Sequence, residues 1–288
     1  MKKWIKVIIA VCIAAVFIRA VAVMAGFNKK GGITGDSIAV IDFKGEIYES
    51  ASFIDALREL KENNLVKGVV IRVNSPGGAV TPSMEIYDYI LKMGKPVYAA
   101  MGSVAASGGY LISLGADSIY AEPSTITGSI GVIMNLVNTQ ELMEKIGIQS
   151  VVIKSGVYKD SGSPARPMTE GDREVLNAVL MDMYHQFTDI VASRRGLTKE
   201  DTLKLADGRI YTGKMAHEVK LINKLGSWRD AADDMKSKLN LPNINYYEVP
   251  EKKTLLEELL EMSSMSWIKE TGKALQRNSG FFYLSEIR

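Results

Sequence analysis

Apolar residues recur along the middle of the chain in two alternating patterns. Short apolar runs of strand length alternate with longer segments in which apolar residues have the three- to four-residue spacing of a helix. This alternation predicts an α/β fold with a largely parallel sheet. The predicted strands are 38–41, 69–73, 97–101 and 118–121, and the predicted helices are 52–63, 82–93 and the segment that follows residue 107.

The later part of the chain continues the alternation less regularly. Thr169 and Asp172 have the spacing of a helix start, and the helix predicted from there reaches about residue 195. The folded domain is expected to cover residues 37–240, and residues 241–288 are expected to form a C-terminal extension. The other predicted elements are helices at 138–146, 214–219, 228–239 and 254–262 and strands at 149–153 and 221–222.

Residues 1–27 have a different character. Three lysines precede an apolar run that is interrupted only by Arg19. A basic start followed by about a dozen apolar residues fits a cleaved secretory signal, whereas the whole run of about twenty residues can span a bilayer as a helix. Because the cleavage site is poor, we expect an uncleaved membrane anchor, followed by a glycine-rich linker at 28–36. The leading lysines predict that the rest of the chain is extracytoplasmic.

Composition narrows the range of functions. Of the 288 residues, 47% are hydrophobic, which is enough for a substantial core. The formal net charge of +2 does not indicate a nucleic-acid partner. Cys12 is the only cysteine, which excludes disulfides and cysteine-based metal sites within one chain. No metal or other cofactor is expected.

Ser107 is the first candidate for chemistry. Two alanines precede it and two glycines follow it, so its backbone can turn sharply and no bulky neighbour shields its hydroxyl. It lies between a predicted strand and a predicted helix, where unpaired backbone N–H groups are available to an oxyanion. From the residues alone, an equally good interpretation is that Ser107 lies in a turn whose small residues serve only close packing.

Two glycine-rich loops, at 74–78 and 102–109, each follow a predicted strand. Because ligand sites in parallel α/β folds collect at the carboxyl ends of the strands, the two loops are expected to share one crevice. Gly77 and Gly78 would let the backbone approach a substrate carbonyl closely. Taken alone, the first loop is more typical of an ordinary turn.

A nucleophilic serine needs a base within hydrogen-bond reach. His185 and His217 are the only histidines, and a surface or packing role is the simpler interpretation of both. A lysine is the alternative base, provided that a site of low dielectric constant lowers its pKa. Lys159 is attractive because it lies in a Gly- and Ser-rich loop next to Tyr158, although most loop lysines only solvate a surface.

Five segments in this order resemble those of a known family. The chain resembles the short prokaryotic signal peptide peptidases A, which are Ser-Lys proteases of peptidase family S49. The resemblance covers residues 38 to about 239, and it implies the Clp protease/crotonase-like fold of repeated ββα units with an N-terminal transmembrane helix. The segments are Asn74–Gly78 (NSPGG), Ala105–Tyr110 (AASGGY), Thr127–Val132 (TGSIGV), Tyr158–Asp160 (YKD) and Asp207–Gly213 (DGRIYTG).

The resemblance also implies a mechanism and partners. Ser107 is the implied nucleophile and Lys159 the implied general base of a peptide-hydrolysing dyad. The family hydrolyses remnant signal peptides in the membrane as a ring-shaped homo-oligomer whose active sites can draw on neighbouring protomers. The implied partners are therefore hydrophobic peptides, membrane lipid and further copies of the chain. The supporting residues implied in the same way are Ser129, which positions Lys159, and Gly77, Gly78 and Gly108, whose N–H groups form the oxyanion hole.

Two other interpretations remain open. A crotonase-like acyl-CoA enzyme also polarises a carbonyl with glycine-rich loops. Ordinary crotonases use glutamates, however, and neither the expected anchor nor the Ser107 motif suits them. A catalytically inactive membrane scaffold would keep the ring, but the presence of both Ser107 and Lys159 argues against it.

Overall fold

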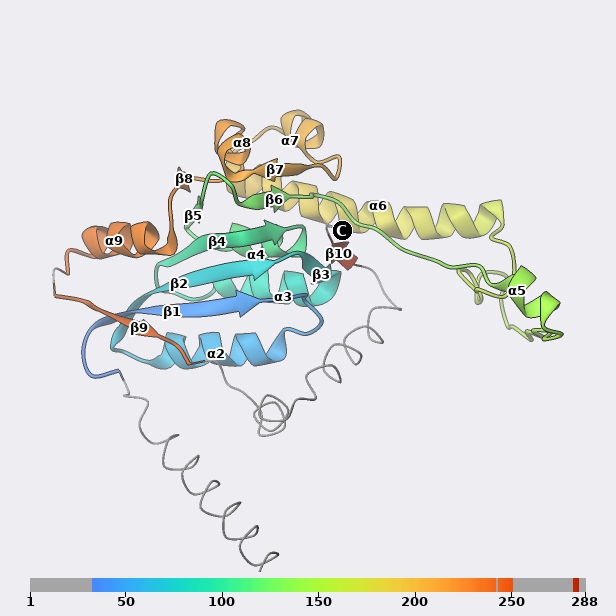
Figure 1. The fold of residues 1–288 in the computed structure, drawn as a ribbon, viewed down its shortest axis with the longest axis horizontal. Coiled ribbons are helices and arrows are strands. Elements are labelled where there is room, and N and C mark those ends of the chain that lie inside the picture. The colour runs from blue at the N-terminus through green and yellow to red at the C-terminus, as the bar shows by residue number, and fades with distance from the viewer. Residues whose placement is uncertain (1–32, 242, 251–281, 285–288) are drawn as a thin grey trace, which may run out of the picture.

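The computed structural model describes residues 33–241, 243–250 and 282–284. Its main sheet has the strand order β7-β6-β4-β2-β1-β9, and β5 branches from β4 and pairs with β8 (Figure 1). Among the described strands of this sheet, all pairs are parallel except β6 with β7. The strands are β1 (Ser37–Lys44), β2 (Val66–Ser75), β4 (Val97–Ala106), β5 (Ser118–Ala121), β6 (Ile126–Gly128), β7 (Ile210–Thr212), β8 (Lys224–Leu225) and β9 (Asn245–Glu248).

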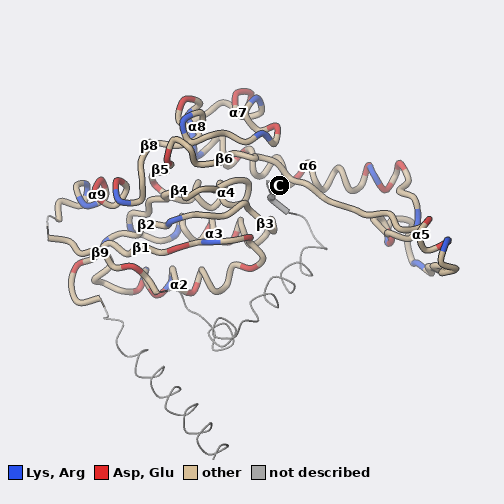
Figure 2. The backbone as a smooth tube through the Cα atoms, in the orientation of Figure 1, with Lys and Arg blue, Asp and Glu red and all other residues tan. Residues whose placement is uncertain are grey.

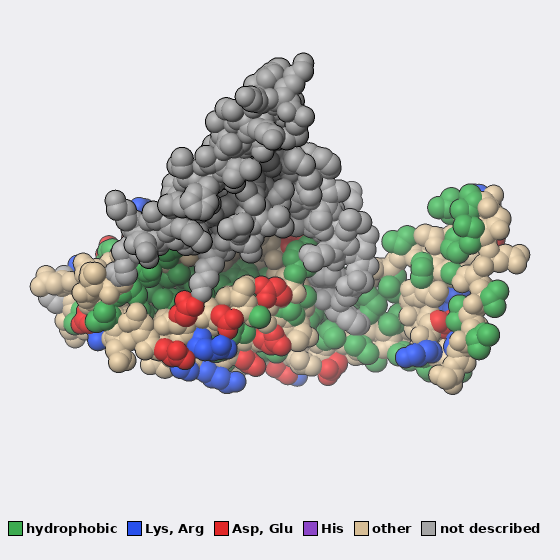
Figure 3. Space-filling model, turned by 90° about the horizontal axis from the view of Figure 1, so that it is seen from below, with side chains coloured by type: hydrophobic (Ala, Val, Ile, Leu, Met, Phe, Trp, Pro, Cys, Tyr) green, Lys and Arg blue, Asp and Glu red, His purple; other side chains and the backbone are tan. Residues whose placement is uncertain are grey.

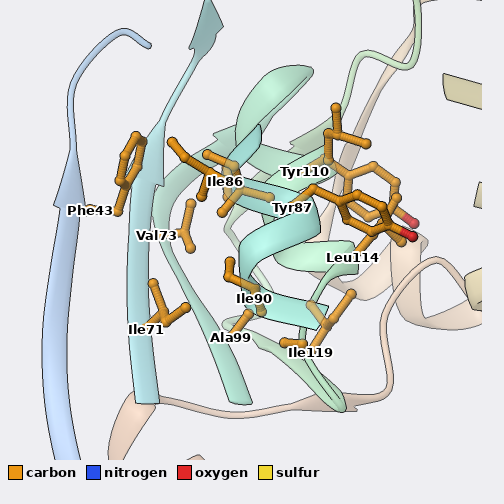
Figure 4. Packing of buried hydrophobic residues seen from close by; sticks show 14 of the residues in the cluster. Phe43, Ile71, Val73, Ile86, Tyr87, Ile90, Ala99, Tyr110, Leu114 and Ile119 are labelled. Atoms are coloured by element: carbon orange, nitrogen blue, oxygen red, sulfur yellow. The ribbon is translucent and has the colours of Figure 1, made fainter. Parts of the chain in front are cut away.

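Helices cover both faces of this sheet. In β1, Ala39 and Ile41 pack with α2 (Ala51–Glu62), α3 (Val80–Leu91) and α4 (Gly108–Leu114). Ile38 and Val40 point the other way and pack with α9 (Trp228–Leu239). Buried side chains of α3 and α4 face those of β2 and β4 across the larger core (Figure 4). Burial on both faces explains why the central strands are almost continuously apolar.

A long helix, α6 (Glu170–Arg195), joins this body to a projecting segment. Its C-terminal half is docked, because Phe187 is fully buried and Arg194 donates to the carbonyls of Leu114 (2.7 Å) and Ala116 (2.8 Å). α7 (Lys199–Leu205) and α8 (Gly213–Glu218) follow it. The N-terminal half of α6 leaves the body and is largely exposed.

Residues 133–169, which we call the arm, extend away from the sheet beside the exposed half of α6 (Figure 1). The arm contains one short helix, α5 (Gln140–Lys145), and its outgoing and returning segments are joined by a hydrogen bond from Thr139 N–H to the Pro164 carbonyl (2.7 Å). Many of its apolar side chains are exposed, including Ile153 at 97%. The arm therefore lacks a core of its own.

The predicted α/β alternation is confirmed, as are the strand 118–121, the helix 228–239 and the capped start of α6, where Thr169 and Asp172 form a capping box. The strand predicted at 149–153 is wrong, because this segment is an exposed loop of the arm. The strand predicted at 221–222 is displaced to β8. β9 lies in the expected C-terminal extension and adds to the sheet beside β1.

The expected anchor and the helix predicted at 254–262 lie outside the described residues. Within the described ranges, none of the helices is long and apolar enough to cross a bilayer. Lys and Arg residues are interspersed with Asp and Glu along the backbone of the body, in keeping with the small net charge (Figure 2).

Docking of α6 depends on Phe187. We expect Phe187→Ala to lower the free energy of unfolding by about 3–5 kcal/mol, because it leaves a cavity in the core. Val179→Ala, on the half-exposed face of the same helix, is the control and should change it by less than about 0.5 kcal/mol. Chemical denaturation of both variants measures the difference, and equal effects would contradict the docked position of α6.

Candidate active site

Ser107 lies at the junction between β4 and α4, as its sequence context predicts. Its N–H donates to the Gly128 carbonyl (2.7 Å) and its carbonyl accepts from Leu111 N–H (2.9 Å). These bonds hold it at φ 54° and ψ −118°, a conformation that non-glycine residues rarely adopt. Backbone strain of this kind is concentrated at functional sites.

The Ser107 hydroxyl is buried and unsatisfied. The residue has 0% exposed surface, and its Oγ has no hydrogen-bond partner among the described residues. Burying a hydroxyl without a partner is unfavourable, and each such group in a folded protein needs an explanation. A base or a substrate that is supplied from outside this chain's described residues would satisfy it.

The two glycine-rich segments meet at Ser107, as predicted, but they are not loops throughout, because residues 102–106 extend β4 and Gly77–Ala79 form β3. A Cβ added at Gly108 would lie 3.3 Å from Gly77 Cα and 2.6 Å from Ser83 Oγ, and one added at Gly78 would collide with the Ile47 carbonyl oxygen. Only glycine permits this close packing of the loops. The N–H of Gly77 donates to Ser75 Oγ (3.1 Å).

Ser129 also lies in this site, because it follows Gly128, whose carbonyl binds Ser107. It is buried, has φ 50°, and its N–H donates to the Arg209 carbonyl (2.8 Å). Ser129 opens onto a cleft of about 760 Å³. The lining is mostly apolar and includes Ile130, Val132, Ile133, Leu180, Met181, Tyr184 and Ile210.

A strand from the far end of the chain lies against the first glycine loop. β10 (Phe282–Leu284) pairs antiparallel with β3 (Gly77–Ala79), with Tyr283 opposite Gly78. Figure 1 shows β10 next to β3, at the end of the sheet to which β2 and β4 point. The edge of β3 therefore pairs with an extended segment of this chain close to Gly108, the neighbour of Ser107, which the sequence did not predict.

Lys159 is placed far along the arm. Its loop is tied to the first turn of α6, where Tyr158 lies against Gly171. A rise of 1.5 Å per residue puts Gly171 about 24 Å along α6 from the docked Phe187. The side chain of Lys159 is exposed, and no hydrogen bond or ion pair within the described residues joins its ammonium to Ser107 or to another group.

The two histidines are no better placed. His185 and His217 are both exposed, and His185 contacts only the ring of Tyr184 among the described aromatic pairs. Neither donates to or accepts from Ser107. The described residues of one chain thus bring together Ser107, Ser129 and the glycine-rich segments, but among them no histidine or Lys159 side chain reaches Ser107.

Comparisons with known proteins identify the class of protein. The family model for Clp protease matches residues 36–126, and the fold is a Clp protease-like α/β fold. A solved structure, that of a point mutant of ClpP1 from Listeria monocytogenes, aligns with 67% of this chain and 94% of its own at 19% identity and a TM-score of 0.47. That likeness is too loose to carry a functional argument.

The family model for peptidase family S49 matches residues 90–242, more than half of the chain. The chain belongs to this family and is a protease, so the acyl-CoA enzyme is not supported. It is 38% identical to the provisionally named signal peptide peptidase SppA of Enterococcus faecium, with 75% of this chain and 64% of that protein covered. The provisionally named protease MJ0651 of Methanocaldococcus jannaschii is also 38% identical, with 77% of each covered. Protease 4 of Haemophilus influenzae is 32% identical, with 71% of this chain and only 35% of that protein covered.

Proposed function

We propose that the protein is a serine endopeptidase in which Ser107 is the nucleophile and Lys159 of a neighbouring copy is the general base. The observation that carries this proposal is the Ser107 hydroxyl, which is buried, unsatisfied and held on a strained junction. Because the Oγ of this serine has no partner within the described residues, a base from another chain can hydrogen-bond the hydroxyl and take its proton.

The position of Lys159 supports a base supplied by another copy. A general base must come within about 3 Å of the hydroxyl, but the arm holds Lys159 at the far end of α6 from the docked body. Hydrophobic side chains lie exposed over the arm, at the right of Figure 3. An exposed apolar surface of this kind is typical of a protein interface. The exposed apolar residues of the arm include Val137, Leu142, Ile146, Val151, Ile153 and Val157.

The proposed reaction is acyl transfer. Ser107 Oγ attacks the carbonyl carbon of the peptide bond while Lys159 takes the hydroxyl proton. The tetrahedral oxyanion is stabilised by backbone N–H groups of Gly78 and Gly108, since that of Gly77 is already bonded to Ser75. Lys159 returns the proton to the leaving amine, and water then releases the acyl group. Ser129 hydrogen-bonds Lys159 and orients it.

The proposed substrates are hydrophobic peptides, including remnant signal peptides. A peptide would add to β3 as an antiparallel strand, as β10 does, so that its backbone lies beside Ser107. The apolar cleft next to Ser129 would receive one or more of its apolar side chains. The name of the Enterococcus faecium relative supports signal peptides as the substrate class.

We further propose that residues 1–27 anchor the protein in the cell membrane and that the protease domain is extracytoplasmic. The basic start and the apolar run that follows support this arrangement. Intact mass of the protein isolated from membranes tests it: the anchored chain keeps its first 27 residues. A mature protein about twenty-five residues shorter would indicate a cleaved secretory signal instead.

Assembly of the dyad between copies predicts complementation. Ser107→Ala and Lys159→Ala should each lose peptide hydrolysis as full-length proteins. Oligomers formed by co-expressing the two variants should regain up to about one quarter of the wild-type rate, because random mixing brings Ser107 and Lys159 together at one site in four. His185→Ala is the control and should keep its activity. Co-expressed variants that remain inactive would contradict a shared site.

Removal of the segment that contains β10 should favour substrate binding. A chain that ends at Phe281 no longer places a strand on β3, so we expect a several-fold lower KM for hydrophobic peptides with little change in kcat. A synthetic peptide with the sequence of residues 280–288 should inhibit this shortened protein competitively. An unchanged KM, together with no inhibition, would show that substrates do not use the edge of β3.

A further inference from the structure

The base of the loop that carries Lys159 contains a compact cluster of charges, which we call the arm cluster: Lys154, Asp160, Arg166 and Asp172. Arg166 donates from Nε and Nη2 to the two oxygens of Asp160, each at 2.9 Å. It also donates from Nη1 and Nη2 to Asp172, at 2.5 Å and 3.0 Å. One guanidinium thus joins two carboxylates by paired hydrogen bonds, the strongest geometry available to such a pair.

Neutral groups complete the arm cluster. Ser161 donates its hydroxyl to Asp172 (2.6 Å), and the N–H and hydroxyl of Thr169 donate to the same carboxylate (3.0 and 2.8 Å). Hydrogen bonds from Arg166 and from these groups hold the pKa of Asp172 well below its usual range. Hydrogen bonds from Arg166 and Lys154 lower the pKa of Asp160 in the same way. Both carboxylates therefore keep their charge throughout neutral and mildly acidic pH.

The arm cluster is remote from the main core. All of its members come from the arm or from the first turn of α6, where Lys and Arg occur beside Asp and Glu (Figure 2). Nevertheless, the side chain of Asp172 is only 2% exposed and that of Asp160 only 13%. Such burial in a segment whose apolar side chains are mostly exposed indicates that polar contacts, not a hydrophobic core, fix the shape of this loop.

The arm cluster determines whether Asp160 is available to pair with Lys159, the residue before it in the chain. A carboxylate next to a lysine attracts the ammonium and stabilises it. Here both oxygens of Asp160 are bound by Arg166, and Lys154 adds a third bond to it (2.7 Å). Lys154 also donates to the Val157 carbonyl (2.9 Å), so it is held within the loop. Lys159 alone among the cations of this loop has no partner within the described residues.

We propose that Arg166 is a positioning residue for proteolysis: it fixes the loop to α6 and occupies Asp160, so that Lys159 is presented unpaired to Ser107 of the neighbouring copy. The inference rests on the proposed function. Without Arg166, Lys154 still binds one oxygen of Asp160, but the other oxygen loses its partner. That oxygen becomes available to Lys159, which would then be held as an ammonium and fail as a base.

The test compares full-length variants by kcat, KM and pH–rate profile with a hydrophobic peptide. Arg166→Gln should lower kcat by about tenfold to a hundredfold, because the base is misplaced. It should also move the rising limb of the profile about one unit to higher pH, because Asp160 now stabilises the ammonium. Arg173→Gln is the matched control: Arg173 lies in the first turn of α6 next to Asp172, is exposed and only approaches Glu170 at 4.0 Å. It should behave like the wild type.

A second change separates the charge effect from a purely structural one. Asp160→Asn combined with Arg166→Gln removes the carboxylate, so its profile should return to the wild-type pH even where kcat stays low. Arg166→Lys keeps the charge and should shift the profile less than Arg166→Gln. An Arg166→Gln profile at the wild-type pH, or a double variant as strongly shifted as Arg166→Gln, would overturn the proposal.

Assembly of the variants and the activity of Lys159→Ala complete the test. Sedimentation of each variant shows whether it assembles. If Arg166→Gln does not assemble, Asp160→Asn and the double variant are compared instead, and a higher-pH profile in the double variant would overturn the proposal. Lys159→Ala is measured alongside: if it retains activity, the proposed function fails and the role of Arg166 fails with it. An inactive Lys159→Ala with a wild-type-like Arg166→Gln would refute the role of Arg166 alone.

Discussion

The hydrogen bond from Ser107 N–H to the Gly128 carbonyl holds Ser107, the proposed nucleophile, in its strained conformation. It exists because β6 pairs with the last residues of β4, with Gly128 opposite Ala106. Gly128 has φ +79°, and a Cβ there would lie 2.5 Å from the ring of Tyr211, so the next strand, β7, also restricts this position to glycine. Short strands at the end of the sheet thus determine the backbone geometry of Ser107.

α6 imposes the second constraint. Its last turns are anchored to the body through Phe187 and Arg194, whereas its first turn holds Asp172 and hence the loop of Lys159. A helix of 26 residues is about 39 Å long, so it keeps Ser107 and Lys159 apart within one chain. On the proposed mechanism, activity depends on assembly, because a single chain carries Ser107 without a base.

The sequence was most informative where local chemistry determines structure. The small residues around Ser107 require a sharp turn, the apolar runs require buried strands, and Thr169 with Asp172 forms the predicted cap. Contacts between distant segments were not predictable in this way. β9 and β10 find their partners about 200 residues away, and no local pattern marks Arg166 as the link between Asp160 and Asp172. The apolar segment 149–153 resembled a strand, but the described chain offers it no neighbouring strand.

Cross-linking between isotopically distinct chains measures directly whether the dyad forms between copies. Cys12→Ala removes the only native cysteine, after which Ser107→Cys is introduced into unlabelled chains and Lys159→Cys into ¹⁵N-labelled chains. The chains are assembled together, treated with a short thiol-reactive cross-linker and analysed by mass spectrometry. We predict a cross-linked peptide pair with one labelled and one unlabelled member. Absence of that pair, together with efficient cross-linking in a single chain that carries both cysteines and is kept monomeric, would contradict a site shared between copies.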